Sequence, residues 1–233
     1  MIDIGTTSFL IKVPSLPREE FERYSTNLFD EWEKRVEKSL ILPDYAISLE
    51  IEEGSIKGGG RIAVTLGALY FGIGSYADFI SGLETIRGQV SFVSDALFES
   101  AKSPFGSGSV NAKARKSGGT LSRLHSLFEK VQRGALTADE AMIEATALFG
   151  EEGNEVPEFI DELQHQLRNV PRYPEQLSLT GEGWDKSDGD LSRTTKRPPQ
   201  RPRPKPVPIN QQYRIEIWRE SKKDKKHVKL VNL

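Results

Sequence analysis

The chain has no cysteine and only three histidines among its 233 residues. Structural disulfides, thiolate zinc sites, iron–sulfur clusters and cysteine nucleophiles are therefore excluded. Hydrophobic residues make up 36 % of the sequence, whereas an ordinary globular domain has roughly 45–50 % with glycine counted. A disordered segment would account for this shortfall. The length suits one domain or two small ones.

Motifs of catalysis and cofactor binding are also lacking. No GxSxG, HExxH, kinase or deaminase pattern occurs. Glu162 and His165 have the Glu-x-x-His spacing of di-iron bundles, but there is no second copy, which favours a solvent-facing pair. The glycine run Lys57–Arg61 lacks the spacing of a nucleotide-binding loop, which favours a plain flexible turn. We therefore predict a non-enzymatic protein with no catalytic residue, no metal site and no cofactor.

Hydrophobic periodicity predicts an α+β fold. Strands at Thr7–Val13 and Tyr45–Ile51 flank a helix from Pro17 to about Leu40, which gives an N-terminal β-α-β unit at 1–56. Residues 57–103 predict a central apolar helix followed by an amphipathic one, and 104–119 a flexible basic loop. An αα-hairpin and a short helix follow at 120–171, with a capping box at Thr137 and Glu140.

The last third of the chain predicts a disordered Pro/Arg-rich linker at 172–211 and a C-terminal β-hairpin at 212–233. Proline at this density is incompatible with a helix or a central strand. Because an isolated hairpin is marginal in water, we expect the terminal hairpin to dock on the sheet of the body or on a partner.

The segment Ile62–Ile80 is the first candidate for function. Its first sixteen residues carry no charge and would span only about 24 Å as a helix, against a bilayer core near 30 Å. Two interpretations remain open: insertion into or binding at a membrane, and burial in a soluble core. Small and tyrosine side chains favour membrane contact or self-association into a homo-oligomer, and the candidate residues are Ala63, Gly67, Ala68, Tyr70, Gly72 and Tyr76.

Charge asymmetry supplies the second candidate. Residues 193–233 hold thirteen basic and three acidic side chains, a net charge of +10, so that 1–192 carries −12 of the total −2. Candidate residues for an anionic partner are Arg193, Lys196, Arg197, Arg201, Arg203 and Lys205. Pro199 and Pro202 also form a PxxP element that suits an SH3-like protein partner, and a linker that merely tethers the hairpin is the alternative.

Met1–Val13 has no basic region or cleavage site of a secretory signal, which predicts a cytoplasmic location, at the inner face of a membrane if the apolar helix binds one. The sequence thus predicts a non-enzymatic interaction protein, a membrane-associated accessory or effector protein acting through Ile62–Ile80. The alternative is a soluble module that binds nucleic acid or another partner through its basic C-terminal tail. A small enzyme is the third hypothesis.

Overall fold

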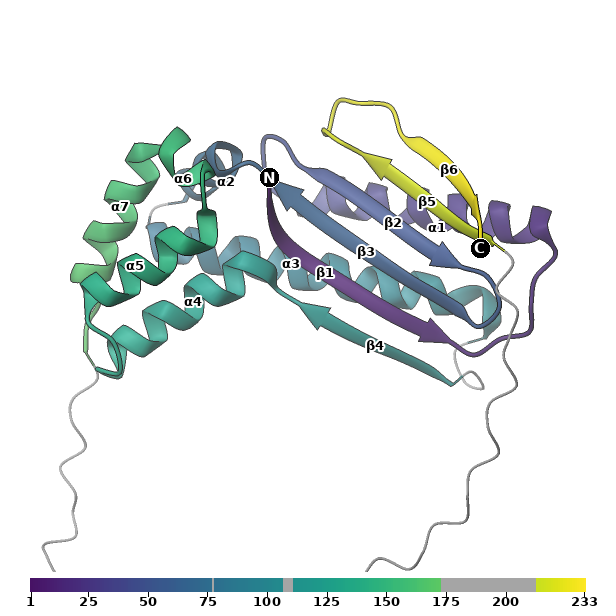
Figure 1. Cartoon of the computed structure of the whole chain (residues 1–233), viewed down its shortest axis with the longest axis horizontal. Helices are drawn as coiled ribbons and strands as arrows, with labels where there is room; N and C mark the ends of the chain where they lie inside the picture. The colour runs from purple at the N-terminus through teal and green to yellow at the C-terminus, as the bar shows by residue number, and fades with distance from the viewer. Residues whose placement is uncertain (77, 107–110, 173–212) are drawn as a thin grey trace, which may run out of the picture.

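The computed structural model describes residues 1–76, 78–106, 111–172 and 213–233. It confirms the α+β class: helices pack on a six-stranded antiparallel sheet whose strand order is β4-β1-β3-β2-β5-β6 (Figure 1). The strands are β1 (Ile2–Ile11), β2 (Ala46–Glu52), β3 (Ile56–Val64), β4 (Ala112–Ser117), β5 (Tyr213–Arg219) and β6 (His227–Asn232).

Two long helices, α1 (Arg18–Ser39) and α3 (Phe79–Lys102), cover one face of the sheet and lie behind it in Figure 1. The Trp32 indole of α1 donates to the Val93 carbonyl of α3 over 3.1 Å, which joins the two helices. Beneath this contact lies Gly60 of β3, where a Cβ would be only 2.3 Å from Leu97 and 3.1 Å from Trp32. The close packing of these helices on the sheet therefore depends on a residue without a side chain.

A helical lobe adjoins one end of the sheet, at the left of Figure 1. It contains α2 (Leu66–Ile73), α4 (Gly119–Gln132), α5 (Ala138–Phe149), α6 (Glu152–Glu155) and α7 (Pro157–Arg168). The ring of Phe159 lies at its centre, 5.2–5.7 Å from the rings of Tyr70, Phe79 and Phe149. The αα-hairpin is confirmed as α4 and α5, and so is the capping box at Thr137 and Glu140. A short 3-10 turn, η1 (Ser103–Phe105), follows α3.

The single apolar helix predicted within Ile62–Ile80 is wrong. The chain continues as β3 to Val64, forms only the eight-residue α2, and turns before α3 begins. Two side-chain caps divide the run, because Thr65 accepts from the N–H of Ala68 and Asp78 accepts from the N–H of Ser81. Among the described residues, no helix has the length and apolar character needed to cross a bilayer.

The glycine run Lys57–Arg61 is the interior of β3, and the predicted flexible turn is wrong. Gly60 pairs with Thr7 of β1 on one side and with Leu49 of β2 on the other. The run is a strand because two neighbouring strands hydrogen-bond its backbone and because bulky side chains of the core need the space above it.

Two further boundaries differ from the sequence prediction, and the strand order adds a feature that the prediction did not contain. The segment 104–119, predicted as a flexible basic loop, contains the edge strand β4, which pairs with β1. The first strand begins at Ile2 rather than at Thr7. β1 and β2 are not neighbours, because β3 lies between them. The terminal hairpin is confirmed as β5 and β6, and it docks on β2 of the body.

Of the predicted linker, residues 173–212 lie outside the described part of the chain.

Candidate functional site

The sheet has one face that no described helix covers over β3, β2 and β5. In Figure 1 this face is turned towards the viewer, with α1 and α3 behind it. Side chains alternate along a strand, so the residues that do not point at α1 and α3 point to this side. We call the surface that these side chains form the open face.

Antiparallel pairing aligns the side chains of the open face in rows across all six strands. From β4 to β6, the first row is Ser117, Thr6, Arg61, Ser48, Trp218 and His227. The second row is Arg115, Ser8, Gly59, Glu50, Glu216 and Lys229. The third row is Lys113, Leu10, Lys57, Glu52, Arg214 and Val231. At about 4.8 Å between strands, each row is about 24 Å long.

The first row holds an arginine and an aromatic pair but no carboxylate. Arg61 is exposed between the hydroxyl residues Thr6 and Ser48, and its side chain makes no ion pair or hydrogen bond with any described residue. Trp218 stacks on His227 with ring centroids 5.4 Å apart and planes inclined by 23°. Only the strand that carries Ser48 separates Arg61 from Trp218, so their Cα atoms are about 10 Å apart. One extended ligand can therefore contact both the cation and the rings.

Carboxylates occur in the middle of the other two rows, and basic neighbours pair with them. Lys57 lies 2.9 Å from Glu52. Arg214 lies 3.1 Å from Glu50 and 3.1 Å from Glu216. The three carboxylates outnumber Lys57 and Arg214 by one, so the middle of these two rows keeps one net negative charge. The other basic side chains of the two rows, Lys113, Arg115 and Lys229, lie at the ends of the rows.

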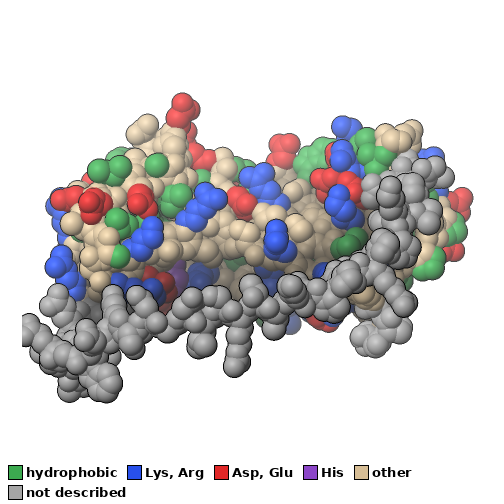
Figure 2. Space-filling view, turned by 60° about the horizontal axis from the view of Figure 1, so that its bottom comes forward, with side chains coloured by type: hydrophobic (Ala, Val, Ile, Leu, Met, Phe, Trp, Pro, Cys, Tyr) green, Lys and Arg blue, Asp and Glu red, His purple; other side chains and the backbone are tan. Residues whose placement is uncertain are grey.

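Two unpaired cations lie at the β4 edge of the open face. Lys113 and Arg115 are exposed and make no ion pair with a described residue. Figure 2 brings this lower edge of Figure 1 forward and shows Lys and Arg side chains over the middle of the molecule. Together with Arg61 they form a positive region at one end of the rows, and Trp218 lies towards the other end.

A shallow open groove of about 670 Å³ crosses the sheet beside these cations. Ser8, Leu10, Lys57, Gly59 and Arg115 are among the residues that line it. The groove exists because Gly59 has no side chain and Ser8, its neighbour in the row, has a small one. It gives an extended ligand a recess lined by the basic side chains of Lys57, Lys113 and Arg115 and also by the carboxylates of Glu50 and Glu52.

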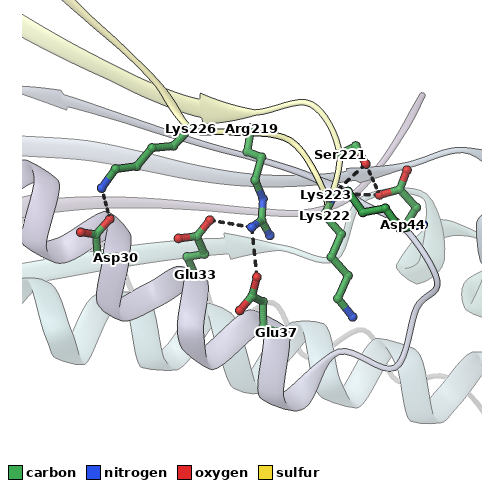
Figure 3. Close-up of polar contacts among 9 residues, drawn as sticks. All are labelled: Asp30, Glu33, Glu37, Asp44, Arg219, Ser221, Lys222, Lys223 and Lys226. Atoms are coloured by element: carbon green, nitrogen blue, oxygen red, sulfur yellow. Dashed lines mark hydrogen bonds and ion pairs between the residues drawn. The ribbon is translucent and has the colours of Figure 1, made fainter.

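The hairpin that carries Trp218 is anchored to α1 by a buried arginine (Figure 3). Arg219 follows Trp218 and points to the opposite face of β5, where only 5 % of its surface is exposed. Its Nη1 lies 2.7 Å from Glu33 Oε1 and 3.0 Å from Glu37 Oε1, both on α1. The ion pairs fix the position of β5 and hence of the indole on the open face.

The turn of the hairpin has a second anchor, Asp44, just before β2. Its carboxylate accepts hydrogen bonds from Ser221 Oγ over 2.8 Å and from the N–H of Lys222 over 2.7 Å (Figure 3). Burial alone would raise the pKa of Asp44, but these hydrogen bonds and one from the N–H of Tyr45 outweigh it and lower the pKa. An ion pair between Lys226 and Asp30 is the third anchor, and like that of Arg219 it joins the hairpin to α1. The ionised form of Asp44 therefore stabilises the docked hairpin.

The six residues predicted for membrane contact or self-association do not share a helix face. Ala63 lies in β3, whereas Gly67, Ala68, Tyr70 and Gly72 lie in α2 and Tyr76 follows it. Two of the side chains have partners inside the protein, since the Tyr70 ring packs edge-on against Phe159 and the Tyr76 hydroxyl accepts from Gln89. Gly72 lies against Leu42 in the core. The six residues therefore do not form one helix surface, and their contact with a membrane or a second copy stays a prediction.

The residues predicted for an anionic partner, Arg193, Lys196, Arg197, Arg201, Arg203 and Lys205, lie outside the described residues. The sequence prediction missed Arg61, Lys113, Arg115 and Trp218. Lys113 and Arg115 alternate with alanines in a way that indicates an edge strand, and this signal was present in the sequence. No sequence signal places Trp218 in a row with Arg61, because the pairing of β5 with β2 creates it.

Neither a metal-binding cluster among the described residues nor a similarity to a known protein points to a further site. Within residues 1–76, 78–106, 111–172 and 213–233, no cluster of three or more His, Asp or Glu side chains is arranged to hold a metal ion. His165 is exposed and bonds with Asn169, one turn further along α7. Comparisons with protein-family models, with curated proteins and with solved structures find no match to this chain.

Proposed function

We propose that this chain is a non-enzymatic protein that binds single-stranded nucleic acid on its open face. The observation that carries the proposal is the first row, which has no carboxylate. In it Arg61, which has no ion pair with a described residue, lies two strands away from the Trp218–His227 stack. In the proposed complex a base stacks on Trp218, while Arg61, Lys113 and Arg115 contact phosphates.

The geometry favours a single strand over a duplex. Trp218 is half-buried and its ring stacks on His227, so only a base whose flat face is free can stack on the accessible part of the indole. The bases of a duplex are already stacked on each other. Row lengths of about 24 Å suit a short extended stretch of nucleotides that crosses the strands. The proposal keeps nucleic acid as the ligand and assigns its binding to the sheet.

Fluorescence anisotropy with labelled single-stranded oligonucleotides of about ten nucleotides tests the proposal. Replacing Trp218 by Ala should weaken binding about 5- to 150-fold, because base–aromatic stacking contributes about 1–3 kcal/mol per base. Trp218→Phe retains a ring and should recover most of the affinity. Double replacement of Arg61 and Arg115 by Ala should reduce the salt dependence, the slope of log K against log salt, by about 1.4.

The matched control is Arg35→Ala, which removes an exposed cation from α1 on the opposite side of the sheet. It should leave the affinity and the salt dependence unchanged. The proposal fails if the chain does not bind at about 50 mM salt, where phosphate contacts are strong. It also fails if Trp218→Ala and the double arginine variant bind as tightly as the original protein, or if duplex of the same length binds better.

A further inference from the structure

Strand β6 forms an edge of the sheet with apolar side chains and no partner on its outer side among the described elements. Val228 is 55 % exposed, although it points to the side of the sheet that the helices cover elsewhere. Leu230, on the same side of β6, is only half-buried. Helix α1 packs on β5 and β2, so the helix layer ends before it covers β6. An exposed edge of this kind is a template for pairing with another strand.

The opposite edge of the sheet has a different character. Lys113, Arg115 and Lys116 place three cations within the six residues of β4, and charge of this density protects an edge strand from pairing. Pairing β4 of one copy with β6 of another would bring these cations near Lys229. The charges therefore disfavour a head-to-tail chain of copies and leave the pairing of like edges, β6 with β6.

We propose that a second copy of this chain occupies the β6 edge, so that the two β6 strands pair antiparallel about a two-fold axis. Directly opposite residues in an antiparallel pair face the same side of the sheet, so the axis must pass between two equivalent residues. An axis at Lys229 would place two ammonium groups opposite each other, which is destabilising. An axis at Leu230 pairs Val228 with Asn232 and Lys229 with Val231, and no like charges are opposed.

In this dimer the two sheets form one continuous sheet, and the open faces of both copies lie on the same side. Leu230 packs against its equivalent on the helix side, where each copy alone leaves the strand uncovered. The axis closes the assembly at two copies, because each chain has only one β6 edge. The pairing does not require nucleic acid, so the proposal stands independently of the ligand of the open face.

Sedimentation equilibrium of the full chain over a range of concentrations measures the dimer directly. We expect a reversible monomer–dimer equilibrium that Leu230→Arg shifts to monomer, with a dissociation constant raised at least about tenfold. The control is Ala114→Arg, which introduces the same side chain at the helix-side position of the other edge strand and should leave the equilibrium unchanged. A monomer at every concentration, or an equal effect of both variants, would overturn the proposal.

Cysteine cross-linking gives a second test that does not depend on a disruptive substitution, because the chain has no native cysteine. At the proposed axis, the Cα atoms of opposite residues are about 4.5–5.5 Å apart, within the range of about 4.4–6.8 Å that a disulfide spans. Leu230→Cys should therefore form an intermolecular disulfide on mild oxidation. Lys229→Cys and Ala114→Cys should cross-link much less, because neither residue faces its own equivalent. Equal cross-linking of all three variants would refute the register. Leu230→Arg should still bind a short oligonucleotide, which separates failure of the dimer from failure of the proposed function.

Discussion

Replacing Gly60 by Ala tests whether the glycine run is a packed strand. Gly60 points at the helix layer, where a Cβ would lie 2.3 Å from Leu97 Cδ2 and 3.1 and 3.3 Å from the Trp32 indole. Both neighbours are buried, so neither can move away into solvent. Gly59 points to the open face instead, and the nearest atom to its Cβ would be the Thr7 carbonyl oxygen at 3.8 Å.

The two substitutions should therefore have opposite signs. Overpacking of a core costs about 1–3 kcal/mol, and this is the expected loss of unfolding free energy for Gly60→Ala. Gly59→Ala meets no obstacle and restricts the unfolded chain, which should raise the unfolding free energy by about 0.4–1 kcal/mol. The unfolding free energies of the two variants should differ by about 1.4–4 kcal/mol. Only the side of the sheet to which each residue points accounts for the difference.

Urea unfolding followed by circular dichroism measures these changes, provided that the dependence on urea, the m value, is the same in all three proteins. Equal unfolding free energies for Gly60→Ala and Gly59→Ala would refute the packed strand and favour a flexible turn, in which the two glycines are equivalent. A stabilised Gly60→Ala would show that Leu97 and Trp32 do not pack on β3.

Three further predictions concern the hairpin anchors and the helical lobe. Replacing Glu33 and Glu37 together by Gln leaves the Arg219 guanidinium buried without a carboxylate and should cost about 2–4 kcal/mol in urea unfolding; a loss near zero would contradict the anchor. The folded-state pKa of Asp44 lies below its ordinary value of 3.8, so its stabilisation is present above that pH and is lost as the pH falls through the folded pKa. The difference in unfolding free energy between the original protein and Asp44→Asn should therefore shrink in acid, and a constant difference would refute this. Thr137→Ala removes the capping box and should cost about 1 kcal/mol, measured by thermal melting; an unchanged melting temperature would contradict it.

Local signals in the sequence were sufficient for several elements. The apolar spacing between Pro17 and Leu40 predicted α1, and the structure places that helix at Arg18–Ser39. Thr137 and Glu140 predicted a helix start because both hydrogen bonds of a capping box join residues three positions apart. Alternation after Tyr213 predicted the terminal hairpin. In each case the interactions that stabilise the element lie within a few residues of one another or within one amphipathic period.

Tertiary structure alone decided the strand character of the glycine run and the composition of the open face. Glycine has little intrinsic preference for a strand, so β3 forms because β1 and β2 pair with it and because Trp32 and Leu97 pack on Gly60. The row that joins Arg61 to Trp218 requires a strand near the start of the chain to pair with one near its end. Such register depends on contacts between residues far apart in sequence, which no local pattern specifies.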